Sequence, residues 1–427
     1  MGMTIVEKVM SRNAGLASVR PGQYVDCRLD RVIAHEEFYR IHTAAEAAGL
    51  QGGLPQIWDR ERLHVILEHF QPVIDQTQAL RQRKIREAAE RYRLTYFDDA
   101  LPGVVHRIAI EDYVLPGELA LGADSHSTAW GALNCCGTGM GEHELVFAIV
   151  FGTLWFKVPE TIRVNLHGSM ASHQSGKDVM LWLGGRYGSD FALYKAIEFR
   201  GDGAGRMAIE ARITLATHAV ELGGKFGLFE FDDKAAAFLD ARKRTRHQLA
   251  WAKPVAADPE AAYCQTIDID LPSLEPQVAR PHTFENVVPV SEVAGTRIDQ
   301  AMVGSCANGH LDDLRAVAGV VQGRRVHPRT RFVVQPASWM VYREAMRLGL
   351  IDTMLDAGVM VISPGCHVCF GMQGTLADGD VCLTSTTRNH RGRMGSDNAE
   401  IYLASPVTVA ASALAGEIVH PREVVRS

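Results

Sequence analysis

Two cysteine motifs carry the clearest chemical signal in the chain. Cys366 and Cys369 form a Cys-x-x-Cys pair in "SPGCHVCFGM", and Cys306 lies in "GSCANGHLDDLR". A redox pair of the thioredoxin type usually opens a helix early in a small domain, whereas this pair lies late in a long chain. A structural zinc site usually takes four ligands from two such pairs, and the sequence contains only one.

Three thiolates from these motifs would leave one coordination position open. Sulfur ligands favour zinc or an iron–sulfur cluster, and a cluster held by only three protein ligands exposes one iron. An exposed iron can act as a Lewis acid on a substrate hydroxyl. Alternatively, the three cysteines are core residues without a metal, as free cysteines often are. The motif spacing by itself leaves these alternatives open.

The Cys-x-x-Cys pair is expected at the end of a parallel strand. "RFVVQP" (331–336) and "VMVIS" (359–363) predict buried strands. Between them the pattern predicts a helix capped by Ser338 and a second helix near residues 351–358, which makes a strand–helix–strand unit and therefore a parallel sheet. Open parallel sheets bind ligands at the carboxyl ends of their strands. Cys306 likewise follows a short apolar stretch and precedes a predicted helix, so both motifs can converge at one sheet edge.

Similar signals recur along the rest of the chain. Residues 118–128 predict an apolar strand that turns polar at Asp124-Ser125-His126, and "TIRVNLHG" (161–168) predicts a half-exposed strand by its alternation. Three helices are also predicted. One begins at a capping box formed by Ser175 and Asp178, and a second covers 207–222 and ends at Gly223 and Gly224. The third has Ser405 as its N-cap, Pro406 at its first position and Gly416 as its C-cap.

Length and composition limit the class of protein. The 427 residues are 47% apolar and 22% charged, which is ordinary for a globular protein of two or three domains. The net charge of −6 argues against a nucleic-acid or anionic-membrane partner. The apolar run 145–156 is too short to span a bilayer, the N-terminus has no secretory signal, and eight cysteines are too few for a disulfide scaffold. We therefore expect a cytoplasmic protein of three α/β domains, at 1–162, 163–285 and 286–427.

Five sequence blocks, in order, resemble the aconitase family, and within it the isopropylmalate isomerase large-subunit branch. They are "GADSHSTAWGAL", "GSCANGHLDDLR", "SPGCHVCFGM", "TSTTRNHRGRMG" and "YLASPVTVAASALAG". The resemblance covers nearly the whole chain. It implies three α/β domains around a central 4Fe-4S cluster held by Cys306, Cys366 and Cys369, with one iron open. It also implies reversible loss and addition of water on a hydroxy di- or tricarboxylic acid.

The resemblance implies roles for ten further residues. The catalytic set is Glu68, His69, His106, Asp124, His126 and Glu221, in which His69 donates a proton, His106 couples to Asp124, and His126 couples to Glu221. The substrate-binding set is His35, Ser125, Arg388 and Arg393, the arginines being suited to carboxylates. Arg391, in the same basic loop, is expected at the surface.

The chain also departs from the family pattern. Glu68 stands where the family has aspartate, His35-Glu36 stands where it has His-Asp, Thr217 and Thr387 stand where it has asparagine, and Ala307 replaces the threonine of the "GSCTN" block. These changes leave the thiols, histidines and arginines in place, so they indicate an active relative with an altered substrate or cluster.

The resemblance implies a partner, because the swivelling fourth domain of single-chain aconitases has no counterpart among these blocks. A separate small subunit is expected to carry it, together with a serine base. The substrate alternatives are an isopropylmalate-like acid and another diacid of the methylmalate–citraconate, dimethylmalate, maleate or homoaconitate type. The non-enzymatic alternatives are an RNA-binding regulator and a zinc-binding or metal-free scaffold.

Overall fold

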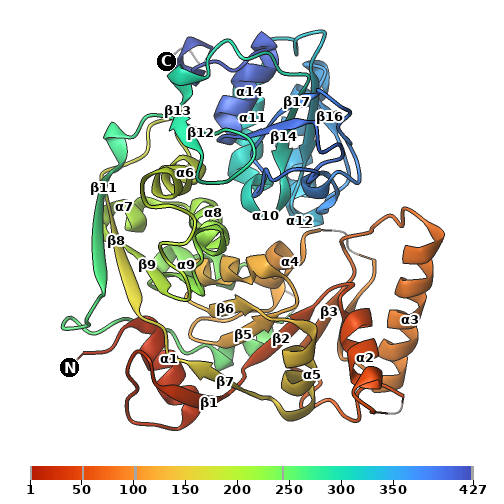
Figure 1. Ribbon diagram of the computed structural model, residues 1–427, viewed down its shortest axis with the longest axis vertical. Coiled ribbons are helices and arrows are strands. Elements are labelled where there is room, and N and C mark those ends of the chain that lie inside the picture. The colour runs from red at the N-terminus through yellow and green to blue at the C-terminus, as the bar shows by residue number, and fades with distance from the viewer. Residues whose placement is uncertain (1, 51, 101–102, 243–244, 425–427) are drawn as a thin grey trace.

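The computed structural model describes residues 2–50, 52–100, 103–242 and 245–424, which are organised by four β-sheets. In Figure 1 the N-terminal part (red to yellow) and the C-terminal part (cyan to blue) lie at opposite ends, and the middle part (yellow to green) packs beside both. The N-terminal and C-terminal parts contact each other near the labels α4, α10 and α12. There the backbone N–H of Val104 donates to the carbonyl of Ala337 at 2.7 Å.

The first large sheet is parallel throughout, with strand order β4-β3-β2-β5-β6. Its strands are β2 (Arg31–Ala34), β3 (Leu63–Ile66), β4 (Tyr96–Asp98), β5 (Leu119–Gly122) and β6 (Cys136–Gly139), and the helices of this part are α1 (Ile5–Ala14), α2 (Phe38–Ala47), α3 (Gln76–Tyr92), α4 (Val105–Asp112) and α5 (Glu142–Phe151). The predicted polar turn after an apolar strand is confirmed, because β5 ends at Gly122 and Asp124 caps the 3₁₀ helix η1 (Ser125–Leu133). A separate antiparallel ribbon pairs β1 (Tyr24–Arg28) with β7 (Thr153–Lys157).

The second large sheet is also parallel, with order β10-β9-β8-β11. Its strands are β8 (Thr161–His167), β9 (Ala196–Arg200), β10 (Phe226–Phe229) and β11 (Gln265–Asp270), and its helices are α6 (Gly176–Tyr187), α7 (Gly201–Arg206), α8 (Ile209–His218), the 3₁₀ turn η2 (Ala219–Leu222) and α9 (Asp233–Asp240). The capping box of Ser175 and Asp178 on α6 is confirmed, as is the closure of α8–η2 at Gly223. The predicted half-exposed alternation of β8 is wrong: five of its seven residues are buried, because β8 is an inner strand and its polar residues Thr161 and Asn165 contact Thr4 and Asp268.

The third large sheet has seven strands in the order β13-β12-β18-β17-β14-β15-β16; β12 pairs antiparallel with both β13 and β18, and the other pairings are parallel. The strands are β12 (Gln277–Ala279), β13 (Val287–Pro289), β14 (Gln300–Gly304), β15 (Arg331–Gln335), β16 (Met360–Val361), β17 (Val381–Thr384) and β18 (Glu400–Leu403), and the helices are α10 (Ser305–Asn308), α11 (Leu311–Val321), α12 (Trp339–Arg347), α13 (Leu350–Asp356) and α14 (Pro406–Ala415). Ser338 caps α12 and Ser405 caps α14, so the predicted β15–α12–α13–β16 unit and the final helix are confirmed.

The remaining regular elements are short 3₁₀ turns: η3 (Arg246–Trp251), η4 (Leu271–Ser273), η5 (Val290–Glu292), η6 (His367–Phe370) and η7 (Pro421–Glu423). Among the described residues, no helix combines the length and the apolar character needed to cross a bilayer. The three large sheets take their strands from residues 31–139, 161–270 and 277–403. The division into domains at 162/163 and 285/286 stays a prediction.

The first two sheets pack through a very close backbone contact at Gly131. A Cβ placed on Gly131 would lie 1.7 Å from the carbonyl oxygen of Gly227, at the start of β10. Gly131 lies in η1, directly after the fully buried Trp130, so the backbone there has no room to retreat. The glycine is therefore required by the packing of η1 against β10.

Replacing Gly131 with alanine is expected to destabilise the fold by about 3–5 kcal/mol, because a backbone shift must relieve the overlap. The matched control is Gly205→Ala in α7, where an added Cβ meets nothing within 4 Å and helix propensity favours alanine. Urea unfolding of both variants measures the difference. Equal stabilities would contradict this account of the packing.

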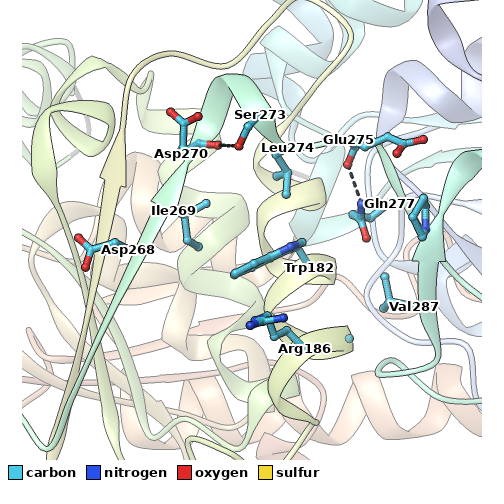
Figure 2. A pocket seen from close by; sticks show the side chains of 12 residues that line it. Trp182, Arg186, Asp268, Ile269, Asp270, Ser273, Leu274, Glu275, Gln277 and Val287 are labelled. Atoms are coloured by element: carbon cyan, nitrogen blue, oxygen red, sulfur yellow. Dashed lines mark hydrogen bonds between the residues drawn. The ribbon is translucent and has the colours of Figure 1, made fainter.

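A wide groove opens beside α6, away from the strand ends that carry the predicted site. Figure 2 shows Trp182 and Arg186 on α6 facing it, with Asp268 and Ile269 of β11 on one side and Gln277 and Val287 on the other. The groove has a volume of about 680 Å³, and no residue predicted for the site lines it.

Candidate active site

The predicted site residues of the N-terminal part lie at the carboxyl ends of neighbouring parallel strands. His35 follows β2, Glu68 and His69 follow β3, and Asp124 and His126 follow β5. Because β3, β2 and β5 are adjacent in the sheet, their end loops converge. His35, His69 and Asp124 present polar atoms within 4.8 Å of one another, and so do His106, Asp124 and His126.

The cysteines follow strands of the facing sheet. Cys306 comes directly after β14 in α10, and Cys366 and Cys369 lie after β16, around η6. Ser305, just before Cys306, has a φ of 68°, a left-handed conformation that a non-glycine residue rarely adopts. Such local strain is typical of functional turns, and here it turns the chain sharply from strand into helix in front of the thiol.

One cavity of about 320 Å³ brings the two ends of the molecule together. Its lining consists of His69, Phe70, Val104, His106, Asp124, His126, Cys306, Cys366, Cys369, Phe370, Met372, Arg388 and Arg393. All three motif cysteines therefore face one space, although Cys306 lies 60 positions or more from the other two in the sequence. Of the remaining predicted residues, His35, Glu68, Ser125 and Glu221 lie behind this wall and contact residues that form it.

Two histidines of the cavity wall, His106 and His126, are each paired with a carboxylate. His106 Nε2 lies 2.9 Å from Asp124 Oδ1, and His126 Nε2 lies 2.7 Å from Glu221 Oε1. Burial lowers the pKa of His106 despite the opposing charge of Asp124. Burial also disfavours the charged form of His126, but hydrogen bonds with Asp124 and Glu221 raise its pKa. The pKa values of the two imidazoles are therefore shifted in opposite directions, although their ring centroids lie only 6.1 Å apart.

His69 is held by a second set of carboxylates. Its Nδ1 pairs with the carboxylate of Glu68, which is fully buried, and its Nε2 lies 3.7 Å from Asp124 Oδ2. The His35 ring stacks on it with ring centroids 4.3 Å apart. Burial opposes protonation, but Glu68, Asp124 and Glu36 together raise the pKa of His69 to about 10. His69 is therefore protonated at neutral pH and can donate a proton into the cavity.

The two predicted arginines are tied to different parts of the site. Arg388 donates from Nε to Glu221 Oε1 at 2.9 Å and from Nη2 to Ser125 Oγ at 3.0 Å. Arg393 places Nη2 3.4 Å from Cys369 Sγ, and its buried Nε has no hydrogen-bond partner among the residues that the structure describes. Arg391 is exposed, as predicted.

The three thiols are buried at 3%, 8% and 2% relative exposure for Cys306, Cys366 and Cys369. A hydrogen bond from Cys366 and the charge of Arg393 hold the pKa of Cys369 well below its usual range, against the effect of burial. Three soft sulfur donors around one space, with a cationic side chain beside them, fit an iron–sulfur cluster better than a single hard ion.

Sequence reasoning missed several residues of the cavity wall. Val104, Phe70, Phe370 and Met372 line it, and three of these directly follow or closely follow a predicted site residue. That proximity was the only available signal, since apolar residues near a motif usually serve packing. The departures Thr217 and Thr387 are both buried, and Thr387 Oγ1 lies 3.7 Å from Cys369 Sγ.

Comparison with known proteins identifies the family. The model of the aconitase family (aconitate hydratase) matches residues 62–297 and 291–416. The chain belongs to the aconitase family. Its membership confirms the resemblance drawn from the sequence blocks, and the parallel α/β sheets agree with the fold class expected of an aconitase-family protein.

Several members of the aconitase family align with the chain from end to end. The 3-isopropylmalate dehydratase large subunit of Moorella thermoacetica is 39% identical over 100% of both chains, and that of Syntrophus aciditrophicus is 40% identical over 99% of this chain and 100% of its own. The 3-isopropylmalate dehydratase large subunit 2 of Archaeoglobus fulgidus is 40% identical, again over 99% and 100%. The holo-form of Thermococcus kodakaraensis aconitase X matches more weakly, with a TM-score of 0.49 and 10% identity over 90% of this chain and 89% of that chain.

Proposed function

We propose that the chain is the cluster-binding large subunit of a hydro-lyase that removes water from, and adds it back to, a substituted malate. The observation that carries the proposal is the 320 Å³ cavity, whose lining includes three thiols, His69, two arginines and the histidines of the His106–Asp124 and His126–Glu221 pairs. The names of the full-length relatives point to an isopropylmalate-like acid. We infer a cytoplasmic location and the three-domain division given above.

Cys306, Cys366 and Cys369 would hold the 4Fe-4S cluster. When bound, the cluster supplies a Lewis acid to the substrate hydroxyl through an iron that has no protein ligand. Arg388 and Arg393 bind substrate carboxylates, since a planar guanidinium matches a carboxylate with two parallel hydrogen bonds. His69 donates a proton to the departing hydroxyl, and Glu68 and Asp124 hold that proton on its ring until then.

The proton taken from the neighbouring carbon needs a base. We infer that a separate small subunit supplies it and closes the open side of the cavity. The chain alone would then bind the cluster and have little activity.

The test is anaerobic purification of the chain with its small subunit, followed by assay with a panel of substituted malates and the matching unsaturated diacids. We expect conversion of at least one pair and strong dependence on the small subunit. An intact cluster with no conversion of any panel member would exclude the proposed reaction.

Arg388 offers a test of substrate binding. Lysine at this position keeps the charge but cannot reach both Glu221 and Ser125, so we expect Arg388→Lys to raise KM for the diacid about tenfold or more with an unchanged cluster content. The exposed Arg391→Lys is the matched control in the same loop. Steady-state kinetics measure KM for the wild type and both variants. If the KM of Arg388→Lys equals that of the wild type, Arg388 does not bind the substrate.

A further inference from the structure

Glu36 holds the loop that carries Glu68 and His69. Its buried carboxylate accepts hydrogen bonds from the backbone N–H groups of three consecutive residues: Glu68 at 3.0 Å (Oε1) and 3.2 Å (Oε2), His69 at 3.1 Å (Oε2), and Phe70 at 3.2 Å (Oε1). Gln82, on α3, donates from Nε2 to Oε1 at 3.3 Å. A single side chain thus satisfies the backbone donors at the end of β3.

This arrangement keeps Glu36 ionised. Successive backbone N–H groups that point inward form a concavity that binds anions. Burial favours the neutral acid, but the hydrogen bond from His35, the charges of His69 and His35 and the Glu68 amide together lower the pKa of Glu36 to about 2. The carboxylate is therefore negative at any pH at which the protein would work.

Besides Glu36, the loop is attached further along, where the Phe70 carbonyl accepts from Gln82 Nε2 at 3.2 Å and Gln71 Nε2 donates to the Asp99 carbonyl at 3.3 Å. Leu67, one residue before Glu68, donates its backbone N–H to Asp98 at 2.8 Å and so belongs to the sheet. Beyond it, the Glu68 side chain is held through the pairing of its carboxylate with His69 Nδ1. The direction of the His69 ring is set by the backbone that Glu36 holds and by stacking on His35.

We propose that Glu36 is a positioning residue: it fixes the backbone that aims His69 into the cavity and keeps a negative charge beside that imidazole. The consequence for catalysis rests on the proposed function, in which His69 is the proton donor. The charged, titratable and aromatic groups that face His69 are Glu68 and Phe70 from its own loop, His35 and Glu36 from the loop after β2, Asp124 from the loop after β5, and His367 and Phe370 from the cysteine loop.

The test compares Glu36→Gln with Glu36→Asp and with Glu37→Gln. Glutamine replaces one carboxylate oxygen, which accepts hydrogen bonds from backbone N–H groups, with an NH₂ group that cannot accept them. Aspartate keeps the negative charge, but its side chain is one methylene shorter and lies further from the loop. Glu37 is the neighbouring residue, and its side chain pairs with Arg40 at 3.2 Å instead of with the loop. All variants are full-length, anaerobically purified protein, and their cluster content is measured first.

Two readouts do not depend on activity. In Glu36→Gln, hydrogen exchange at amides 68–70 should accelerate about tenfold or more, since loss of a hydrogen bond to a charged group is worth at least that factor. By NMR of histidine-labelled protein, the His69 imidazole (assigned by its absence in His69→Asn) should titrate at a lower pH than in the wild type. Glu36→Asp should give intermediate values, and Glu37→Gln should match the wild type.

Unchanged exchange and unchanged His69 titration in Glu36→Gln would overturn the proposal. If Glu36→Gln does not fold, the comparison between Glu36→Asp and Glu37→Gln decides in the same way. If both readouts shift as expected but the wild-type complex dehydrates no malate, Glu36 still positions His69 and only the role of His69 as a proton donor fails.

Discussion

Replacing Cys366 with serine should abolish retention of the iron–sulfur cluster, so that bound iron falls from about four per chain to near zero. A serine hydroxyl is a hard, poorly ionised donor, and iron–sulfur clusters depend on thiolates. The three thiols share one cavity, so loss of one leaves the cluster with two protein ligands. Iron and sulfide analysis after anaerobic reconstitution, with the visible absorbance, measures the effect.

Cys264→Ser provides the matched control. Cys264 is exposed and donates to the carbonyl of Thr161, in the second sheet. This variant should keep its full iron content. If Cys366→Ser also retained its iron, the assignment of the three ligands would be wrong.

The second large effect is expected at His69. His69→Asn removes the proton donor while leaving the three thiols in place, and a positioned acid is worth roughly 10²- to 10⁴-fold in rate. We therefore expect kcat to fall by about this factor with an unchanged iron content. His143, which is exposed at the start of α5, is the control, and His143→Asn should behave as the wild type.

The pH profile separates this role from a structural one. His69 has a pKa of about 10, so it is protonated over the whole neutral range and loses its proton only as the pH rises through that value. The kcat/KM of the wild type should decline over the same interval, and His69→Asn should lack that decline. If kcat/KM of His69→Asn still declined at alkaline pH as in the wild type, a group other than His69 would be the proton donor.

The fold could be predicted from the sequence wherever local signals were strong. Ser338 and Ser405 cap helices as predicted, and β15 and β16 form the expected parallel unit. The burial of β8 could not be predicted, because polar residues such as Arg163 and Asn165 alternate along it with apolar ones. Arg163 donates to Asn165, and Asn165 donates to Asp268 on the next strand, so these polar side chains are partly shielded by one another, which is a tertiary effect.

The structure brings the side chains predicted for the site close together, but the spacing of the residues in the sequence could not predict which histidine pairs with which carboxylate. His126 and Glu221 are 95 positions apart, and only the resemblance to a family brought them together before the structure did. The convergence of Cys306 with the later pair followed from a physical rule about parallel strand ends. The role of Glu36 could not be predicted, because no sequence pattern marks an acidic residue whose carboxylate accepts hydrogen bonds from three backbone N–H groups.

We infer that three sulfur ligands hold a cluster and leave one iron free for substrate. Mössbauer spectroscopy of the iron-57-labelled, anaerobically purified complex tests it most directly, with and without a substituted malate. We expect a single iron site whose spectrum changes when the acid is added, while the other sites stay as they were. Iron sites that all keep a fully sulfur-bound spectrum in the presence of every acid tested would contradict the account.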